Sequence, residues 1–160
     1  MGETAAIPIR AATAADVEAL ASLRAAFLAE VAGADAADPR LLDALRSYFR
    51  LAVPAGEFVG YVAEADGAAV ATGGLVFHRH APSAKSLDGL EGYVMNMYTA
   101  PPWRGRGIAT RLLHSLLGDA RRRGCARVSL HAISRAHKIY AGAGFTPVDS
   151  EMRLTFPDGL

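Results

Sequence analysis

Cysteine is almost absent from this chain of 160 residues, in which Cys125 is the only one. A single thiol cannot form an intramolecular disulfide, so a cytoplasmic location is the simplest expectation. The chain also lacks a long uninterrupted apolar run, and its N-terminus lacks a charged segment followed by an apolar stretch. We therefore expect neither a membrane span nor a secretory signal peptide.

A large excess of charge is missing as well. The 17 Lys and Arg residues are nearly balanced by 16 Asp and Glu residues, and the formal net charge is +1. Proteins that bind nucleic acids or membrane surfaces commonly carry a marked basic excess, so neither partner is expected. Apolar residues make up 51% of the chain. This share and the length predict one domain over residues 1–160, with a sizeable core.

The chain is organised around residues 93–117. Residues 93–99 are rich in Tyr, Val and Thr, which predicts a strand. Pro101 and Pro102 end it, because proline cannot donate a hydrogen bond to a neighbouring strand. A Gly-rich turn follows, and then leucines at helical spacing, namely Leu112, Leu113, Leu116 and Leu117. The unit is therefore a strand, a tight turn and a helix.

The turn itself predicts an anion site. The first amides of a helix have no partners within the helix, and the helix dipole makes this end attractive to anions. Gly105 and Gly107 leave room for a bulky anion, and Arg104 and Arg106 add positive charge. The spacing is neither that of a Walker loop nor that of a GxGxxG dinucleotide turn. The alternative is an Arg-rich loop that merely caps the helix.

Residues 104–109, Arg-Gly-Arg-Gly-Ile-Ala, resemble the acetyl-CoA signature Arg/Gln-x-x-Gly-x-Gly/Ala of the GCN5-related N-acetyltransferases, the GNAT superfamily. The resemblance implies acetyl-CoA as co-substrate, with the pyrophosphate of coenzyme A as the bound anion. The implied cradle consists of Arg104, Gly105, Arg106, Gly107, Ile108, Ala109 and Thr110. It also implies that the backbone of Met97, Tyr98 and Thr99 holds the pantetheine arm and polarises the thioester, where the alternative is an ordinary core strand.

The remaining patterns predict an α+β fold. Strands are expected at residues 7–10, 58–64, 68–77, 93–99, 127–132, 144–148 and 151–156. Helices are expected from Thr13 or Asp16 to about residue 31, at 39–51, from the Gly-rich turn to about 123, and at 134–141. Asp66-Gly67 predicts a tight turn, and Gly73-Gly74 a bulge or close backbone approach. A mixed sheet of about seven strands flanked by about four helices is similar to the GNAT fold along almost the whole chain.

Tyr140 lies in a second motif. Residues 139–145, Ile-Tyr-Ala-Gly-Ala-Gly-Phe, resemble the GNAT segment Leu-Tyr-x-x-x-Gly-Phe, in which the tyrosine hydroxyl can protonate the leaving thiolate. An ordinary phenol is protonated at neutral pH and can donate. The alternative is a half-buried Tyr that bonds coenzyme A or the backbone. Many members carry Asn seven positions earlier, where this chain has Ile133, and Ser134 is the candidate for that contact with the cofactor.

Two residues are candidates for the general base. Glu91 lies near the start of the organising strand and could deprotonate an amine, although it could equally be an exposed charge. His131 titrates in a suitable range, and its alternative is a packed, hydrogen-bonded histidine. Asn96 is expected to orient the acceptor or a water molecule, and Phe27 to border the substrate. His78, His80 and His114 lack metal-ligand spacing, so no metal is expected.

These residues and the resemblance predict an N-acetyltransferase. It would transfer the acetyl group of acetyl-CoA to a primary amine by direct attack in a ternary complex. The acceptor would be a small-molecule amine, or the N-terminus or a lysine of a protein. Acidic residues around the acceptor pocket would suit a cationic amine, namely Asp35, Asp38, Glu91, Asp149 and Glu151. The alternative is a non-catalytic acyl-CoA sensor or interaction module. A monomer or a homodimer joined through the last strand is expected.

Overall fold

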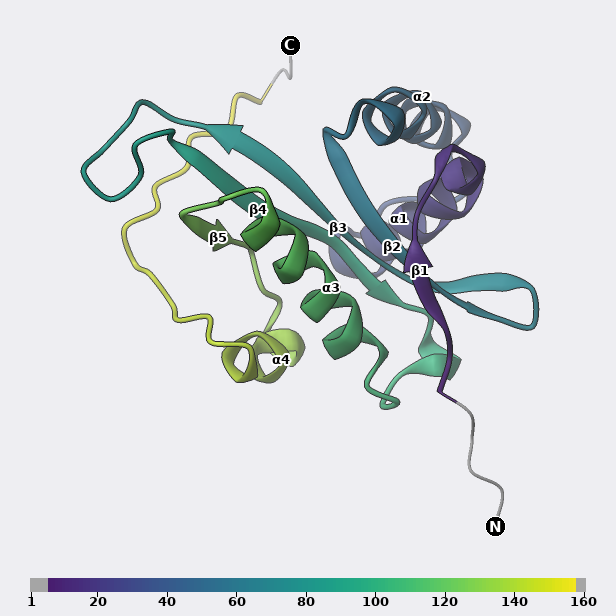
Figure 1. The fold of residues 1–160 in the computed structure, drawn as a ribbon. Coiled ribbons are helices and arrows are strands. Elements are labelled where there is room, and N and C mark those ends of the chain that lie inside the picture. The colour runs from purple at the N-terminus through teal and green to yellow at the C-terminus, as the bar shows by residue number, and fades with distance from the viewer. Residues whose placement is uncertain (1–5, 158–160) are drawn as a thin grey trace.

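The structure is a computed structural model and describes residues 6–157. In this part of the chain five strands form one sheet, in the order β1-β2-β3-β4-β5 (Figure 1). The strands are β1 (Ile9–Ala11), β2 (Phe58–Ala65), β3 (Ala68–Arg79), β4 (Leu90–Thr99) and β5 (Arg127–Ser129). The first four are antiparallel neighbours, whereas β5 runs parallel to β4. A parallel pair needs a crossover, and the helix α3 (Ile108–Arg122) lies in that connection.

Helices cover both faces of the sheet. The helices α1 (Val17–Ala32) and α2 (Pro39–Ala55) lie on one face, and α3 lies on the other with the short α4 (His137–Gly142) beside it (Figure 1). Antiparallel hairpins combined with one parallel crossover confirm the predicted α+β class. The predicted turn between β2 and β3 is also present, with positive φ values at Asp66 (53°) and Gly67 (75°).

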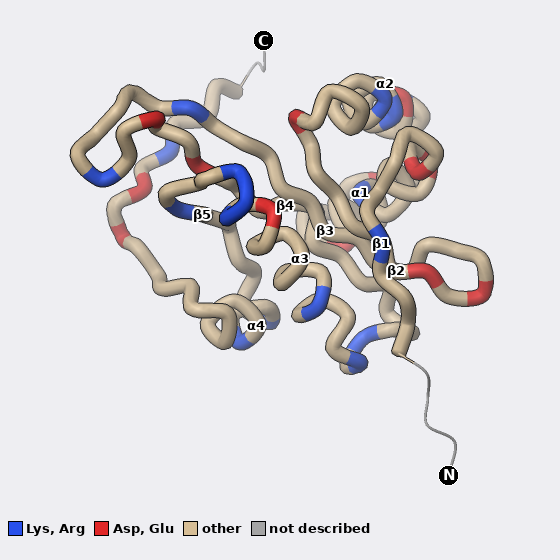
Figure 2. The backbone as a smooth tube through the Cα atoms, in the orientation of Figure 1, with Lys and Arg blue, Asp and Glu red and all other residues tan. Residues whose placement is uncertain are grey.

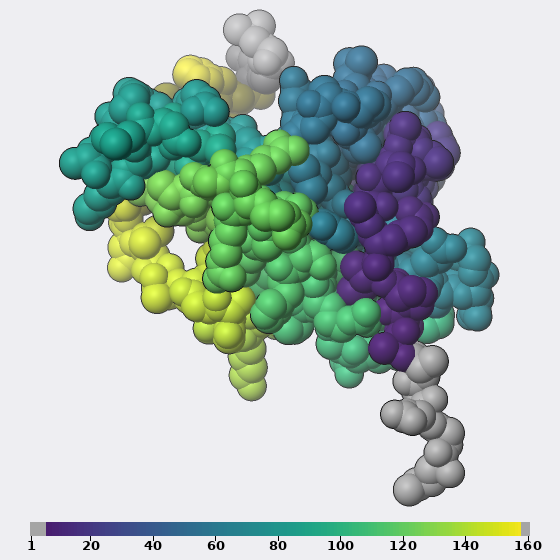
Figure 3. Space-filling view, in the orientation of Figure 1, coloured from purple at the N-terminus to yellow at the C-terminus, as the bar shows by residue number. Residues whose placement is uncertain are grey.

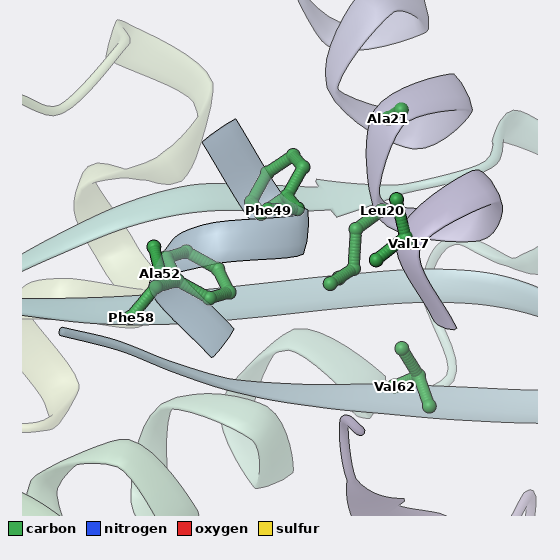
Figure 4. Packing of buried hydrophobic residues seen from close by; sticks show 7 residues of the cluster. All are labelled: Val17, Leu20, Ala21, Phe49, Ala52, Phe58 and Val62. Carbon is green, nitrogen blue, oxygen red and sulfur yellow. The ribbon is translucent and has the colours of Figure 1, made fainter. Parts of the chain in front are cut away.

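An apolar cluster fills the space between each helix layer and the sheet. On the α1 and α2 side, Leu20, Phe49 and Phe58 are almost completely buried (Figure 4). The Phe49 and Phe58 rings meet edge to face, with their centroids 5.0 Å apart. On the other side, leucines of α3 pack on β3 and β4 residues such as Leu75 and Val94. The predicted leucine stripe of α3 is therefore the buried face of that helix.

An ion pair fastens the start of α1 to β1. A short 3₁₀ turn, η1 (Ala14–Asp16), precedes the helix, and Thr13 and Asp16 form a capping box around it. Asp16 is only 6% exposed and accepts two hydrogen bonds from Arg10, at 2.9 and 2.8 Å. Its carboxylate also accepts from the Thr13 amide at 2.7 Å. Arg10 lowers the pKa of Asp16, because these bonds favour the charged carboxylate.

The expectation of seven strands is wrong at the C-terminal end of the described chain. Residues 144–148 and 151–156 pair with no other described strand, and the predicted strand 127–132 is shortened to β5. Alternation of apolar residues predicts a strand only where a partner covers the apolar face. Here the side chains of Val148, Met152, Leu154 and Phe156 are exposed, and the segment after α4 encloses an opening beside the body (Figure 3). A homodimer joined through this segment stays a prediction.

Charged residues of both signs are spread over the chain. Acidic positions lie around the turn between β2 and β3, whereas basic positions gather near both ends of α3 (Figure 2). Among residues 6–157, no helix combines the length and the apolar character that crossing a bilayer requires.

Candidate active site

A bulge in β4 is the first element of the site. Thr72 pairs with Tyr98 and Gly74 pairs with Met95, so Asn96 and Met97 together face the single residue Gly73. Asn96 has a φ of 58°, which few non-glycine residues adopt. The expected bulge is present, although the extra residue lies in β4 and not in β3. A bulge bends its strand and redirects its side chains.

Gly73 explains why the bulge can form at this position. A Cβ atom added there would lie 2.6 Å from the Met97 sulfur, closer than any real side chain permits. The missing side chain at Gly73 thus leaves room for the Met97 side chain beside the bulge. A glycine inside a strand often marks a bulge or a bend in the sheet.

β4 separates from β5 directly before the bulge. Their parallel pairing covers residues 91–93 of β4 and ends at the pair Tyr93 and Ser129. From Val94 onward, β4 has no strand partner on that side within the described chain. Backbone donors and acceptors on this edge are thus left for a ligand, since a strand edge without a neighbour carries unpaired groups.

A cavity of about 660 Å³ occupies the gap. Its walls come from α1, from β4, from the Gly-rich turn with the start of α3, and from residues between β5 and α4. Most of the sequence-predicted site residues line it, namely Phe27, Asn96, Met97, Tyr98, Thr99, Arg104, Gly105, Gly107, Ile108, Ala109, Thr110, His131 and Tyr140. A cavity of this size lies within the usual range for small-molecule sites.

The Gly-rich turn leaves the start of α3 open. Gly105 and Gly107 have positive φ values of 75° and 72°, and an added Cβ atom on either would meet nothing within 4 Å. Gly107 is the N-cap residue of α3, and no side chain caps the helix there. The first amides of a 15-residue helix therefore point toward open space, as an anion site requires.

The Arg104 guanidinium is bonded within the protein, to groups on both sides of this turn. Its Nε donates to the Thr99 carbonyl at 2.8 Å, and its two terminal nitrogens bond the Glu30 carboxylate at 3.0 and 2.7 Å. Glu30, near the end of α1, also forms an ion pair with Arg135. The carboxylate thus joins α1 to both sides of the cavity. The Arg104 bond is the main cause of the lowered pKa of Glu30.

Tyr140 lies on the opposite wall, on α4. Its side chain is 9% exposed and packs edge to face against Phe145, with ring centroids 6.0 Å apart. Burial raises the pKa of the Tyr140 hydroxyl above its usual value of 10.0, with a smaller contribution from Tyr93. The phenol is therefore protonated throughout the neutral range and can donate a proton.

Tyr93, His131 and Glu151 form a chain of hydrogen bonds beside the cavity. Tyr93 Oη lies 2.6 Å from His131 Nδ1, and His131 Nε2 lies 2.8 Å from the Glu151 carboxylate. Arg153 also approaches Nε2, at 2.7 Å, and bonds Glu151 as well. The two partners of Nε2 make opposite demands, because Glu151 can only accept a proton and Arg153 can only donate one. With the ring proton on Nε2, Nδ1 accepts from Tyr93. The histidine is thus held between a hydroxyl and a carboxylate.

Asn96 carries an unusual side chain for a strand residue. It is 2% exposed, and both its Oδ1 and its Nδ2 lack a hydrogen-bond partner among the described residues. Buried amides are nearly always paired, because an unpaired one costs free energy. Asn96 is one of the residues around the cavity, but both atoms of its amide are themselves buried, so the side chain has to move before it can bond a ligand.

Three predicted site residues lie outside the set that lines the cavity. Glu91 forms an ion pair with Arg127 at 2.6 Å, and this bond lowers the pKa of its carboxyl group. Arg106 stacks over the Trp103 ring at 4.8 Å. Ser134 is exposed at the start of the 3₁₀ turn η3 (Ser134–Ala136), while its neighbour Ile133 lines the cavity. The structure therefore does not bring these three together with the others.

The acidic acceptor pocket expected from the sequence is not what the structure has. None of its five proposed carboxylates lines the cavity, and no other described Asp or Glu does so. The charged residues on its walls are Arg24, Arg104 and Arg135, together with His131. Sequence reasoning missed Arg24, although a signal existed: it shares a helix face with Leu20 and Phe27, where an apolar residue is expected.

Within residues 6–157, His, Cys, Asp and Glu side chains nowhere form a group of three that could hold an ion.

Comparison with known proteins places this geometry in a family. The model of the acetyltransferase (GNAT) family matches residues 21–145. The chain belongs to the GNAT acetyltransferase family. The match covers the bulged strand, the Gly-rich turn, α3 and Tyr140, so the predicted family and enzyme class are confirmed. No curated protein matches the sequence closely enough to count as a relative.

Solved GNAT structures resemble this one over most of its length. A GCN5-related N-acetyltransferase from Ralstonia eutropha JMP134 is 30% identical, with a TM-score of 0.82 over 94% of this chain and 98% of that one. A predicted acetyltransferase from Clostridium acetobutylicum, solved with acetyl-CoA, is 29% identical, with a TM-score of 0.84 over 93% and 96%. Glucosamine-6-phosphate N-acetyltransferase from Arabidopsis thaliana shares only the fold, at 17% identity and a TM-score of 0.72 over 94% and 98%.

Proposed function

We propose that this GNAT acetyltransferase transfers the acetyl group of acetyl-CoA to a primary amine by direct attack in a ternary complex. The observation that carries the proposal is the position of one cavity between three elements: the free edge of β4, the uncapped start of α3, and Tyr140. Donor and acceptor can meet in this cavity, because the unpaired edge of β4, the Gly-rich turn and Tyr140 all line it.

Acetyl-CoA fits the walls as a substrate. Its pyrophosphate would be held by the amides of residues 105–110, where both glycines leave open space. Its pantetheine arm would lie along Met97, Tyr98 and Thr99, bonded by the free backbone edge of β4. An amide of this edge can polarise the thioester carbonyl, since a fixed donor stabilises the negative charge that develops on the oxygen.

Tyr93 and His131 are the groups proposed to remove a proton from the amine. With the ring proton of His131 on Nε2, the Tyr93 hydroxyl donates to Nδ1 and can itself accept a proton from the amine or from a water molecule. Glu151 lies on the far side of the imidazole, 2.8 Å from Nε2, and holds the ring in place. This route replaces Glu91, whose carboxylate is held by Arg127 away from the cavity.

Tyr140 is the proposed acid at the other end of the reaction. Its hydroxyl lies in an apolar setting that keeps it neutral, and it can protonate the departing thiolate of coenzyme A. The unpartnered amide of Asn96 would orient the acceptor nitrogen or a water molecule beside it.

Coenzyme A release with a panel of amines and peptides tests the proposal. We expect thiol release with at least one acceptor, and double-reciprocal plots whose lines intersect, as a ternary complex requires. Parallel lines would indicate a covalent acetyl-enzyme and would contradict direct attack. Tight acetyl-CoA binding without thiol release from any acceptor would instead favour the non-catalytic sensor.

A further inference from the structure

Arg24 is a cation without a partner on the cavity wall. It lies in the middle of α1 and lines the cavity, and no described carboxylate bonds it. The other two arginines on the walls have such a partner, because Arg104 and Arg135 share Glu30. Burial lowers the pKa of the Arg24 guanidinium, so the group pays a desolvation cost without a compensating ion pair.

Phe27 fixes the orientation of this cation. The Arg24 guanidinium carbon lies 5.3 Å from the centroid of the Phe27 ring, within the range of a cation–π contact. The Phe27 ring in turn meets Tyr98 of β4 edge to face, at 6.3 Å. The side chain is therefore held against the cavity wall by aromatic residues, and its five N–H donors are left for a ligand.

The position of Arg24 assigns it to the acceptor and not to coenzyme A. Glu30, which fastens α1 to the pyrophosphate turn through Arg104, lies six residues further along the same helix. Six helical residues span about 9 Å. The backbone of Arg24 is thus separated from the residue that holds the turn, and Arg24 lines the same cavity as Tyr93, the proposed proton acceptor.

We propose that Arg24 binds an anionic group of the acceptor, which would be a primary amine that also carries a carboxylate or a phosphate. This rests on the proposed transfer to an amine. The guanidinium fork matches two oxygens of either anion, which gives both affinity and orientation. A fixed cation also disfavours the ammonium form of a bound amine, so it assists the loss of the proton that precedes attack.

The reaction with such an acceptor is balanced without further reagents. The amine nitrogen forms a bond to the acetyl carbonyl carbon, and the bond from that carbon to sulfur breaks. The ammonium loses one proton through Tyr93 and His131 to solvent before attack, and the nitrogen loses a second proton as the amide forms. The thiolate gains a proton from Tyr140, and the second nitrogen proton restores the Tyr140 hydroxyl by way of solvent. The anionic group stays bound to Arg24 and takes no part in the chemistry.

Paired acceptors test the proposal. Within each pair the members differ only in the anion: the amino acids against their amides, and phosphoethanolamine against ethanolamine, with putrescine as a cationic acceptor. Thiol release is measured for the full chain and for R24M. We expect wild type to prefer an anionic member by about tenfold or more in kcat/KM, and R24M to reduce that preference about 10- to 100-fold, mainly through KM.

The control variant is R50M on α2, an exposed arginine outside the cavity for which we expect no change. Acetyl-CoA affinity and thermal unfolding of R24M report whether the variant is folded. A wild-type preference for neutral or cationic amines would overturn this inference and leave the proposed function intact. Equal losses of kcat/KM for both members of a pair in R24M would do the same. Absence of thiol release with every acceptor would overturn the proposed function, and this inference with it.

Discussion

Tyr93 Oη and His131 Nδ1 lie 2.6 Å apart, across the gap where β4 and the chain after β5 separate. The two residues are 38 positions apart in sequence, and both line the cavity. His131 has its other nitrogen bonded to Glu151, so its orientation is fixed from both sides. This geometry supports the proposed path, in which a proton passes from the cavity to the imidazole through the tyrosine hydroxyl.

The first prediction concerns this hydroxyl. Replacement Y93F removes the link between the cavity and His131 while it keeps the aromatic ring. We expect kcat for the amine acceptor to fall about 10- to 100-fold, with acetyl-CoA affinity unchanged. Steady-state kinetics and calorimetry provide the two measurements. Y48F on α2, outside the cavity, is the matched control and should match wild type. Equal activity of Y93F and Y48F would remove Tyr93 from the proton path.

Tyr140 provides the second prediction, because its acid role depends on pH. Its pKa is raised by burial, so the hydroxyl is protonated at neutral pH and ionises only above its usual value of 10.0. Activity that needs the protonated form is therefore retained up to that range and lost beyond it. Y140F should lower kcat about 100-fold with little change in the KM of acetyl-CoA. A higher KM for acetyl-CoA in Y140F, with kcat preserved, would indicate a binding role for the hydroxyl.

Local patterns in the sequence were sufficient for much of the fold and for the geometry of the Gly-rich turn and α3. The glycines at 105 and 107, the two prolines before them and the leucine stripe of α3 each specify local geometry, and all are present as expected. The absence of the two expected C-terminal strands could not be predicted, because strand formation depends on a partner as well as on the alternation of the segment itself. Residues 151–156 alternate correctly and still pair with no described strand.

The acceptor side depends on contacts between distant segments, which a single sequence does not reveal. Glu91 forms an ion pair outside the cavity with Arg127, 36 positions later in the sequence. Glu30 forms ion pairs with Arg104 and Arg135 on the cavity walls. No local pattern encodes these pairings. Arg24 was the exception, since a charge at an apolar position of a helix is visible in the sequence and indicates a special environment.

A third prediction concerns stability. Asp16 has its pKa lowered from 3.8, chiefly by hydrogen bonds from Arg10, so its contribution is complete above pH 3.8 and is lost as the pH falls through the lowered value. D16N should reduce the free energy of unfolding by about 1–3 kcal/mol at pH 7. Urea unfolding at neutral and acidic pH should show the two proteins converge in acid. The exposed pair of Asp43 and Arg46 provides the control D43N, expected to cost less than about 1 kcal/mol at either pH.

The last prediction separates the two consequences of a glycine at positive φ. Gly107 and Gly124 lie at opposite ends of α3, with φ values of 72° and 79°, and an added Cβ atom meets nothing within 4 Å at either position. G107A and G124A should each cost about 1–3 kcal/mol of folding free energy, because alanine is strained there. Only at residue 107 does the new methyl group enter the proposed pyrophosphate cradle, so only G107A should weaken acetyl-CoA binding, by about tenfold or more. Calorimetry gives the affinities and chemical denaturation the stabilities. Equal acetyl-CoA affinity of the two variants would mean that the start of α3 does not bind the pyrophosphate.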